Sequence, residues 1–120
     1  MDFTIPAEFT RNTEKFDAFI KKDILPHLPT WSHQEELPRT FFHNMGSQGW
    51  FGLTFENGCL KRESALKESL ITEKLARISP GTAIGALAHV DLGLLCLFLF
   101  GSPAHQRKLG KAAVEGKTVM

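Results

Sequence analysis

The stretch "SPGTAIGALAHVDLGLLCLFLFGSPAHQ", residues 79–106, decides the fold of this chain. It is rich in leucine, alanine, glycine and phenylalanine, and Asp91 in its middle is its only acidic residue. The run from about residue 82 to residue 100 predicts one long helix, which Gly101 ends. Three interpretations are open for such a helix: a membrane span, the buried centre of a helical bundle, or the wall of a binding site.

The acid in the middle of this stretch argues against a membrane span. A carboxylate at the centre of a bilayer costs about 2.5–3.5 kcal/mol on insertion scales. The four glycines of the stretch lower its hydrophobicity further, and no other segment of the chain is comparably apolar. We therefore expect a helix at the centre of a bundle and no membrane span. The sequence shows no signal or transit peptide, so we expect a cytoplasmic protein.

The composition is that of a globular domain. Hydrophobic residues make up 42% of the chain and charged residues 22%, which predicts a single domain over residues 1–120. With 14 basic and 13 acidic residues interspersed, the net charge of +1 gives no indication of a nucleic-acid partner. Cys59 and Cys96 have neither disulfide nor metal-ligand spacing, so we expect reduced thiols that pack inertly.

Segments on both sides of the central helix predict further helices. In "TEKFDAFIKKDIL", residues 13–25, apolar residues recur with helical spacing. We expect the N-cap of this helix at Asn12 or Thr13 and its end at Pro26. The segment "HLPTWSHQEE", residues 27–36, is interpreted as a connecting loop.

Four more elements follow from capping and turn signals. They are a helix that starts at Pro38 and stops at Gly46 or Gly49, an extended piece over 50–61 with a turn at Asn57-Gly58, a helix over 62–79, and a last helix capped by Ser102 with Pro103 at its first position. The helix over 62–79 has an apolar face made of Leu66, Leu70, Ile71, Leu75 and Ile78. Together the segments predict an all-α fold, a bundle of about five to six helices.

Few residues indicate chemistry of their own. His89 and Asp91 are the most conspicuous pair, but two residues apart on a helix they point roughly 200° away from each other. We expect each to be hydrogen-bonded at a helix surface or at a boundary between helices, with catalysis as the alternative. No histidine or cysteine spacing fits a metal site, and no glycine pattern fits a phosphate loop. The small residues at Gly85, Ala88 and Gly93 allow close approach of a second helix or of a flat apolar ligand.

The order of these segments resembles the N-terminal domain of the acyl-CoA dehydrogenase family. The resemblance rests on "FIKKDILPHLPTWSHQEELPRTFFHNMGSQGWFGLTF" and on "ALKESLITEKLARISPGTAIGALAHVDLGLLCLFLFGSPAHQRKL", followed by Glu115 and Gly116. It covers essentially the whole chain, including Gln106 and Leu109, and it is specific in order and spacing.

The resemblance implies the first of three domains of a flavoenzyme. In this family a middle β-barrel supplies most contacts to FAD, and a C-terminal helical domain supplies the catalytic glutamate and the homo-oligomer interface. We expect neither domain within these 120 residues, so we assign no catalytic, cofactor-binding or metal residue here. FAD is expected in the complete enzyme and not on this chain alone, which leaves open whether the chain alone is an enzyme.

The resemblance also implies a role for the apolar helix, as the wall beside the acyl chain of an acyl-CoA or other acyl thioester. The positions that face the acyl cavity in the family match Ile84, Gly85, Ala88 and Leu92, which we call the acyl stripe. A thioester tail needs an apolar wall whose width small residues can set. The implied reaction is α,β-dehydrogenation of the acyl thioester, with FAD as hydride acceptor.

Two departures from the family pattern carry expectations. The segment "TFENGCLKRES" replaces the family's proline and Tyr-Gly-Gly loop, so the loop near the substrate mouth should differ. Gly110 stands at a usual proline position and should loosen the last helix. Two alternative functions remain: a non-catalytic helical interaction module, or one subunit of a split flavoenzyme that pairs with a second polypeptide.

Overall fold

The computed structural model describes all 120 residues and is dominated by helices. The elements are α1 (Ala7–Phe19), α2 (Leu28–Gln34), α3 (Arg39–Ser47), β1 (Leu53–Glu56), β2 (Cys59–Arg62), α4 (Ala65–Ile78), α5 (Pro80–Leu87), α6 (Leu95–Phe100) and α7 (Pro103–Val114). A π-helical stretch, Ala88–Leu94, joins α5 to α6 and is called the π segment below. The helix Pro80–Phe100 is therefore uninterrupted, and we call it the apolar helix.

α1 is extended in a similar way, because a π turn (Ile20–Ile24) and a 3₁₀ turn (Leu25–His27) lead from it into α2. Counted as continuous bodies, the chain has five helices and one two-stranded antiparallel hairpin. The predicted all-α bundle is confirmed.

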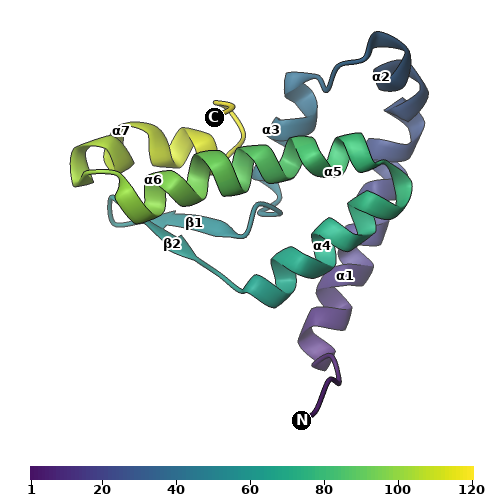
Figure 1. Ribbon diagram of the computed structural model, residues 1–120, viewed down its shortest axis with the longest axis horizontal. Coiled ribbons are helices and arrows are strands. Elements are labelled where there is room, and N and C mark those ends of the chain that lie inside the picture. Colours follow the sequence, from purple (N-terminus) through teal and green to yellow (C-terminus); the bar gives the residue numbers. More distant parts are fainter.

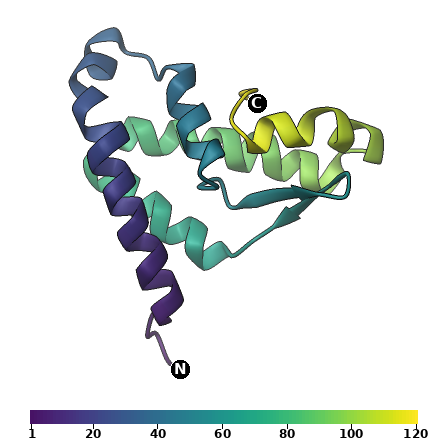
Figure 2. The same ribbon diagram turned by 180° about the vertical axis from the view of Figure 1, so that it is seen from behind.

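The apolar helix runs across the whole molecule (Figure 1). α4 packs against α5 and crosses α1, while α7 packs on α6 and on both strands of the hairpin. α2 lies near the α5 end of the molecule, and the view from behind shows α3 in front of the apolar helix (Figure 2). The domain measures 43 × 39 × 20 Å, so it is a flat body. Because it is flat, one long side of the apolar helix remains at the surface.

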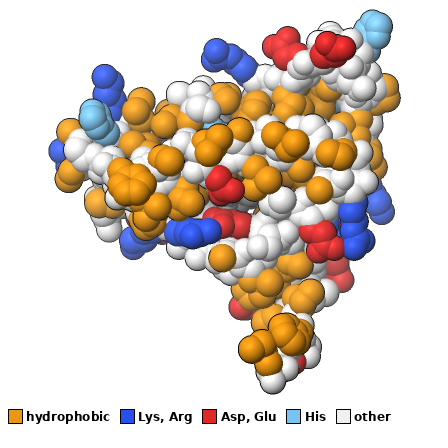
Figure 3. Space-filling view, in the orientation of Figure 1, with side chains coloured by type: hydrophobic (Ala, Val, Ile, Leu, Met, Phe, Trp, Pro, Cys, Tyr) orange, Lys and Arg blue, Asp and Glu red, His pale blue; other side chains and the backbone are white.

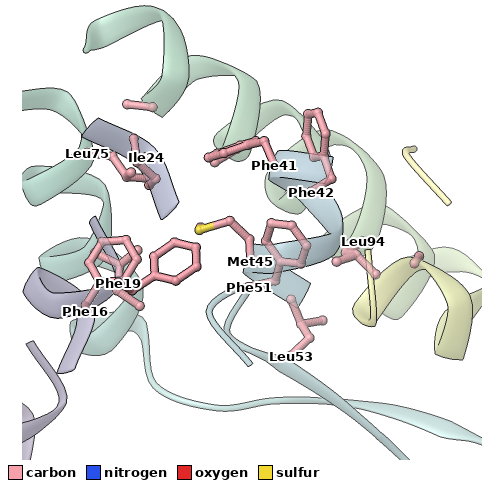
Figure 4. Close-up of a cluster of buried hydrophobic side chains, with 14 of the residues drawn as sticks. Phe16, Phe19, Ile24, Phe41, Phe42, Met45, Phe51, Leu53, Leu75 and Leu94 are labelled. Carbon is pink, nitrogen blue, oxygen red and sulfur yellow. The ribbon is translucent and has the colours of Figure 1, made fainter. Parts of the chain in front are cut away.

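One hydrophobic core joins these elements (Figure 4). Its fully buried large side chains are Phe16, Ile24, Phe41, Met45, Leu53, Leu75 and Leu94. Phe16 packs against the indole of Trp50 with ring centroids 4.9 Å apart, and Phe41 meets both Trp31 and Phe42 edge to face. Aromatic rings thus join α2 to α3, and α1 to the segment that follows α3.

The capping and turn predictions are confirmed where the signals were local. The hydroxyl oxygen of Ser102 accepts a hydrogen bond from a backbone N–H group at the start of α7, as predicted. Ser64 and Ser79 cap α4 and α5 in the same way, although neither was predicted as a cap. Asn57 and Gly58 both have φ above +50°, as the two-residue hairpin turn requires.

Two predictions around the first helix are wrong. α1 begins at Ala7, because Pro6 occupies the N-cap position and its carbonyl accepts hydrogen bonds from Phe9 and Thr10. The supposed loop at residues 27–36 contains α2, in which Pro29 is the second residue. Proline is tolerated there since the first N–H groups of a helix have no intrahelical partner.

Three further expectations are corrected by burial. Leu66 is exposed, so only Ile71 and Leu75 of the predicted α4 face are fully buried. Both cysteines are exposed rather than packed. α7 continues past Gly110 to Val114, and this glycine is buried: a Cβ there would lie 2.9 Å from the ring of Phe55. Gly110 therefore lets the hairpin pack closely on α7.

The closest backbone approach joins α3 to the end of α7. A Cβ on Gly46 would overlap the backbone of Glu115 and Gly116, and a Cβ on Gly116 would overlap the carbonyl oxygen of Phe42. Gly116 also has φ +70°, which favours glycine on its own account. We call this contact the glycine crossing.

Replacing Gly46 with Ala should destabilise the domain by about 1–3 kcal/mol or more, because the obstructing atoms are backbone and cannot rotate away. The matched control is Gly81→Ala in the first turn of α5, where the nearest atom to a new Cβ is Ser79 Oγ at 4.0 Å. Gly81→Ala should be neutral or slightly stabilising, because alanine has a higher helix propensity than glycine. Urea unfolding of both variants checks this. Equal urea midpoints for the two variants would contradict the close backbone contact at the glycine crossing.

Candidate functional site

The apolar helix has a buried side and an open side. Its buried side consists of Thr82, Ala83, Ala86, His89, Leu94 and Leu97. Its open side carries large exposed apolar side chains, which are Ile84, Leu92, Leu99 and Phe100. In the space-filling view hydrophobic side chains follow this helix across the molecule (Figure 3). A hydrophobic side chain that faces water has a free-energy cost, so the open side is the candidate binding surface.

By length and composition alone, this helix could also cross a membrane. Core helices of soluble proteins meet the same criteria. Here α4 packs on one end and α7 on the other, and His89 is buried inside the domain while Asp91 is exposed at the middle. These contacts are those of a helix built into a folded domain.

The structure places most of the acyl stripe on the open side. Ile84 is 66% exposed and Leu92 is 75% exposed, with half-buried Ala88 between them at intervals of four residues. Gly85 differs, because a Cβ there would overlap the Cδ1 atom of Leu37. Leu37 thus borders the stripe, a contact that helical spacing does not reveal.

A hollow lies on the opposite side of the apolar helix, between it and α4. Its lining includes Trp50, Ile71, Leu75, Leu87 and Val90. The interior volume is about 30 Å³, which is room for a single water molecule. Pockets for small organic ligands are typically about 300–1,000 Å³, so this hollow cannot hold an acyl chain or a flavin.

The hollow adjoins an open surface depression of about 460 Å³, whose lining includes Arg62, Glu68 and Asp91. The guanidinium of Arg62 is 2.7 Å from a carboxylate oxygen of Glu68, and this pair raises the pKa of Arg62, with a smaller contribution from Asp91. Asp91 itself is exposed at the surface of the apolar helix. No three metal-ligating side chains lie close enough together to hold a metal ion.

His89 has the structural role that was expected of it. Its ring is 1% exposed, its Nε2 lies 3.0 Å from the carbonyl oxygen of Ala113, and its Nδ1 accepts a hydrogen bond of 3.1 Å from the Met120 N–H. Burial lowers the pKa of His89, and the bond to Ala113 partly opposes this. His89 therefore faces the core and Asp91 the solvent, so the two residues form no joint site.

Gln106 fixes the far end of the apolar helix. Its amide nitrogen donates to the carbonyl oxygens of Phe98 and Gly101, both at 3.3 Å, and its amide oxygen accepts from the Leu60 N–H at 3.2 Å. The last carbonyl groups of a helix lack intrahelical partners, so this side chain caps the helix and ties it to the hairpin. The sequence places Gln106 in the family pattern but does not show these partners.

The geometry defines a small helical domain with one apolar face and no enclosed active site. The family model described as "Acyl-CoA dehydrogenase, N-terminal domain" matches residues 7–117. The chain therefore belongs to the acyl-CoA dehydrogenase family, and it is the N-terminal domain of that family that it contains. Comparisons with curated proteins and with solved structures gave no match.

Replacing Gln106 with Ala should lower the free energy of unfolding by about 1–3 kcal/mol, because one backbone donor and two acceptors lose their partner. Gln48→Ala, at an exposed position after α3, is the matched control and should change it little. Denaturant unfolding measures the free energies, and amide exchange at Leu60 reports the lost bond directly. If Gln106→Ala left the Leu60 amide as protected as before, the capping role would be disproved.

Proposed function

We propose that this chain supplies one apolar wall of the acyl-binding site in an FAD-dependent acyl-CoA dehydrogenase. The observation that carries the proposal is the exposed row formed by Ile84, Ala88 and Leu92 on an otherwise packed helix. The family assignment supports it, since acyl thioesters are the substrates of this family.

The energetic basis of the proposal is burial of the substrate tail. Each methylene group removed from water contributes about 0.8 kcal/mol, so a continuous apolar wall discriminates acyl chains by length. Leu92 would cover the tail, and Ala88, which ends at Cβ, leaves room for it. The wall also excludes water from the tail. Its side chains Ile84, Ala88 and Leu92 have no polar atom that could hydrogen-bond the thioester.

The chemical step belongs to groups outside this wall. In this family FAD accepts hydride during α,β-dehydrogenation of the acyl thioester. The acyl stripe itself has no titratable side chain, so we assign binding and positioning to this chain and no proton transfer. Homo-oligomerisation of the complete enzyme is part of the same proposal.

The alternative is an interaction module, or one subunit of a split flavoenzyme. The exposed side chains of Leu99 and Phe100 favour it, because they extend the open face beyond the acyl stripe toward the hairpin end. Native purification with intact-mass measurement distinguishes the two. Isolation of a 13.4 kDa chain in a stable complex with a second polypeptide would favour the split enzyme.

A single substitution separates a pocket wall from a helix contact. In the flavoenzyme that contains this domain, Ala88→Phe should shorten the accepted acyl chain, because the ring occupies the space of the tail. The isolated domain should tolerate it, as the position is half-buried on the open side. The measurements are kcat/KM across a series of acyl-CoA lengths and the melting temperature.

The control is Ala86→Phe, two residues earlier on the buried side. Overpacking there should cost about 1–3 kcal/mol of stability. It should leave the chain-length preference of the remaining folded enzyme unchanged. If Ala88→Phe destabilised the domain as Ala86→Phe does, and the chain-length profile did not move, the acyl wall would be refuted.

A further inference from the structure

His89 connects three parts of the molecule that are far apart in sequence. It lies in the π segment, and its ring is flanked edge to face by Phe42 of α3 at 5.7 Å and by Phe51 at 4.6 Å. Its two ring nitrogens reach the end of α7 at Ala113 and the backbone of Met120. The imidazole is thus the only side chain that hydrogen-bonds the backbone of residues 117–120, which we call the exit segment.

The two hydrogen bonds fix the protonation state of the ring. The carbonyl oxygen of Ala113 can only accept, so Nε2 carries the hydrogen, and the Met120 N–H can only donate, so Nδ1 must be bare. Only the neutral Nε2–H tautomer satisfies both partners. A second proton on Nδ1 would point at the Met120 N–H, and that hydrogen bond would be lost while the bond to Ala113 persists.

A second contact holds Met120 in the same place. Its side chain packs directly on Gly93, where a Cβ would overlap the Met120 Cβ and lie 3.1 Å from its Cγ. The backbone N–H groups of Lys117 and Thr118 donate hydrogen bonds to the carbonyl oxygen of Ala112. These bonds fix the direction in which the segment leaves α7. The π segment therefore offers a hydrogen-bond acceptor and, four residues later, space for the Met120 side chain.

We propose that His89 and Gly93 form a pH-dependent clasp, which holds the exit segment on the π segment at neutral pH and releases it in mild acid. In the released form Nδ1 faces water. The Nδ1–H group of a protonated ring can then donate a hydrogen bond to water, which it cannot do in the closed form. The proposal uses only contacts within this chain and does not depend on the proposed function.

The direction of the pH dependence follows from linkage. Burial lowers the pKa of His89 below its ordinary 6.5, whereas in the released form the ring regains water and a more ordinary pKa. The released form then binds more protons, so the closed form is fully stable above pH 6.5 and loses stability as the pH falls below it.

No charged neighbour causes this shift, since burial and the Ala113 bond are its only sources. The titratable groups on the elements around the ring are Arg39 and His43 on α3, Asp91 on the π segment, His105, Arg107, Lys108 and Lys111 on α7, and Glu115 and Lys117 after it. Glu115 has its pKa lowered mainly by Lys117, so it stays ionised through the range in which His89 titrates.

The test is a pH titration of the ¹⁵N-labelled chain by NMR, from about pH 7.5 to about pH 5. The His89 ring should titrate with a midpoint below pH 6.5, and the chemical shift of the Met120 amide should change with the same midpoint. Below pH 6.5 the exchange protection of the Met120 amide, corrected for intrinsic exchange rates, should fall by up to about tenfold per pH unit. The slope follows because one proton is taken up when the segment is released. Leu75, in the core of α4, should remain protected throughout.

Variants separate the clasp from simple acid unfolding. His89→Gln keeps a donor and an acceptor but cannot titrate, so Met120 should stay protected in acid; His105→Gln, at an exposed site, should behave as the parent chain. Gly93→Ala displaces Met120 without touching the ring, so the Met120 amide should exchange freely at neutral pH and the His89 midpoint should rise. The proposal is overturned if Met120 ignores the His89 titration, if Leu75 loses protection together with Met120, or if Gly93→Ala changes neither signal.

Discussion

The glycine crossing is the contact on which the rest of the domain depends. Gly46 of α3 and Gly116 after α7 bring two backbones into direct contact, and no side chain fits between them. This contact holds α3 over the middle of the apolar helix, so Phe42 covers His89 and Ala113 comes within hydrogen-bonding distance of its Nε2. The His89 ring is thereby buried with a hydrogen-bond partner at each of its two nitrogens, so its burial leaves no polar ring atom unpaired.

The same arrangement makes the apolar helix asymmetric. α4, α3 and α7 occupy one side of it, and Gln106 holds its last turn against the hairpin. The domain is only 20 Å thick in its shortest direction, so no element remains to cover the other side. A long row of apolar side chains is left open, and in a member of the acyl-CoA dehydrogenase family this row is suited to a substrate tail or to a neighbouring domain.

Local signals predicted much of this fold from the sequence, because the Ser102 cap, the Asn57-Gly58 turn and helical spacing each act within a few residues. The α2 segment was mistaken for a loop, since prolines in a first helical turn look the same as prolines that end a helix. Burial on the apolar helix could not be read from periodicity: almost every residue is apolar, so the sequence does not indicate which side faces α4. The partners of His89, Gly85 and Gly110 lie far away in the chain, and only the fold brings them together.

The central claim is that the open side of the apolar helix, and not the hollow beside α4, contacts the acyl chain. Photolabelling tests it most directly: an acyl-CoA with a diazirine at the end of its tail is irradiated on the flavoenzyme that contains this domain, and the modified residues are mapped by mass spectrometry. The account predicts labelling at Ile84, Ala88 and Leu92, suppressed by excess unlabelled acyl-CoA. Labelling confined to Ile71, Leu87 and Val90 around the hollow, or to other domains alone, would contradict it.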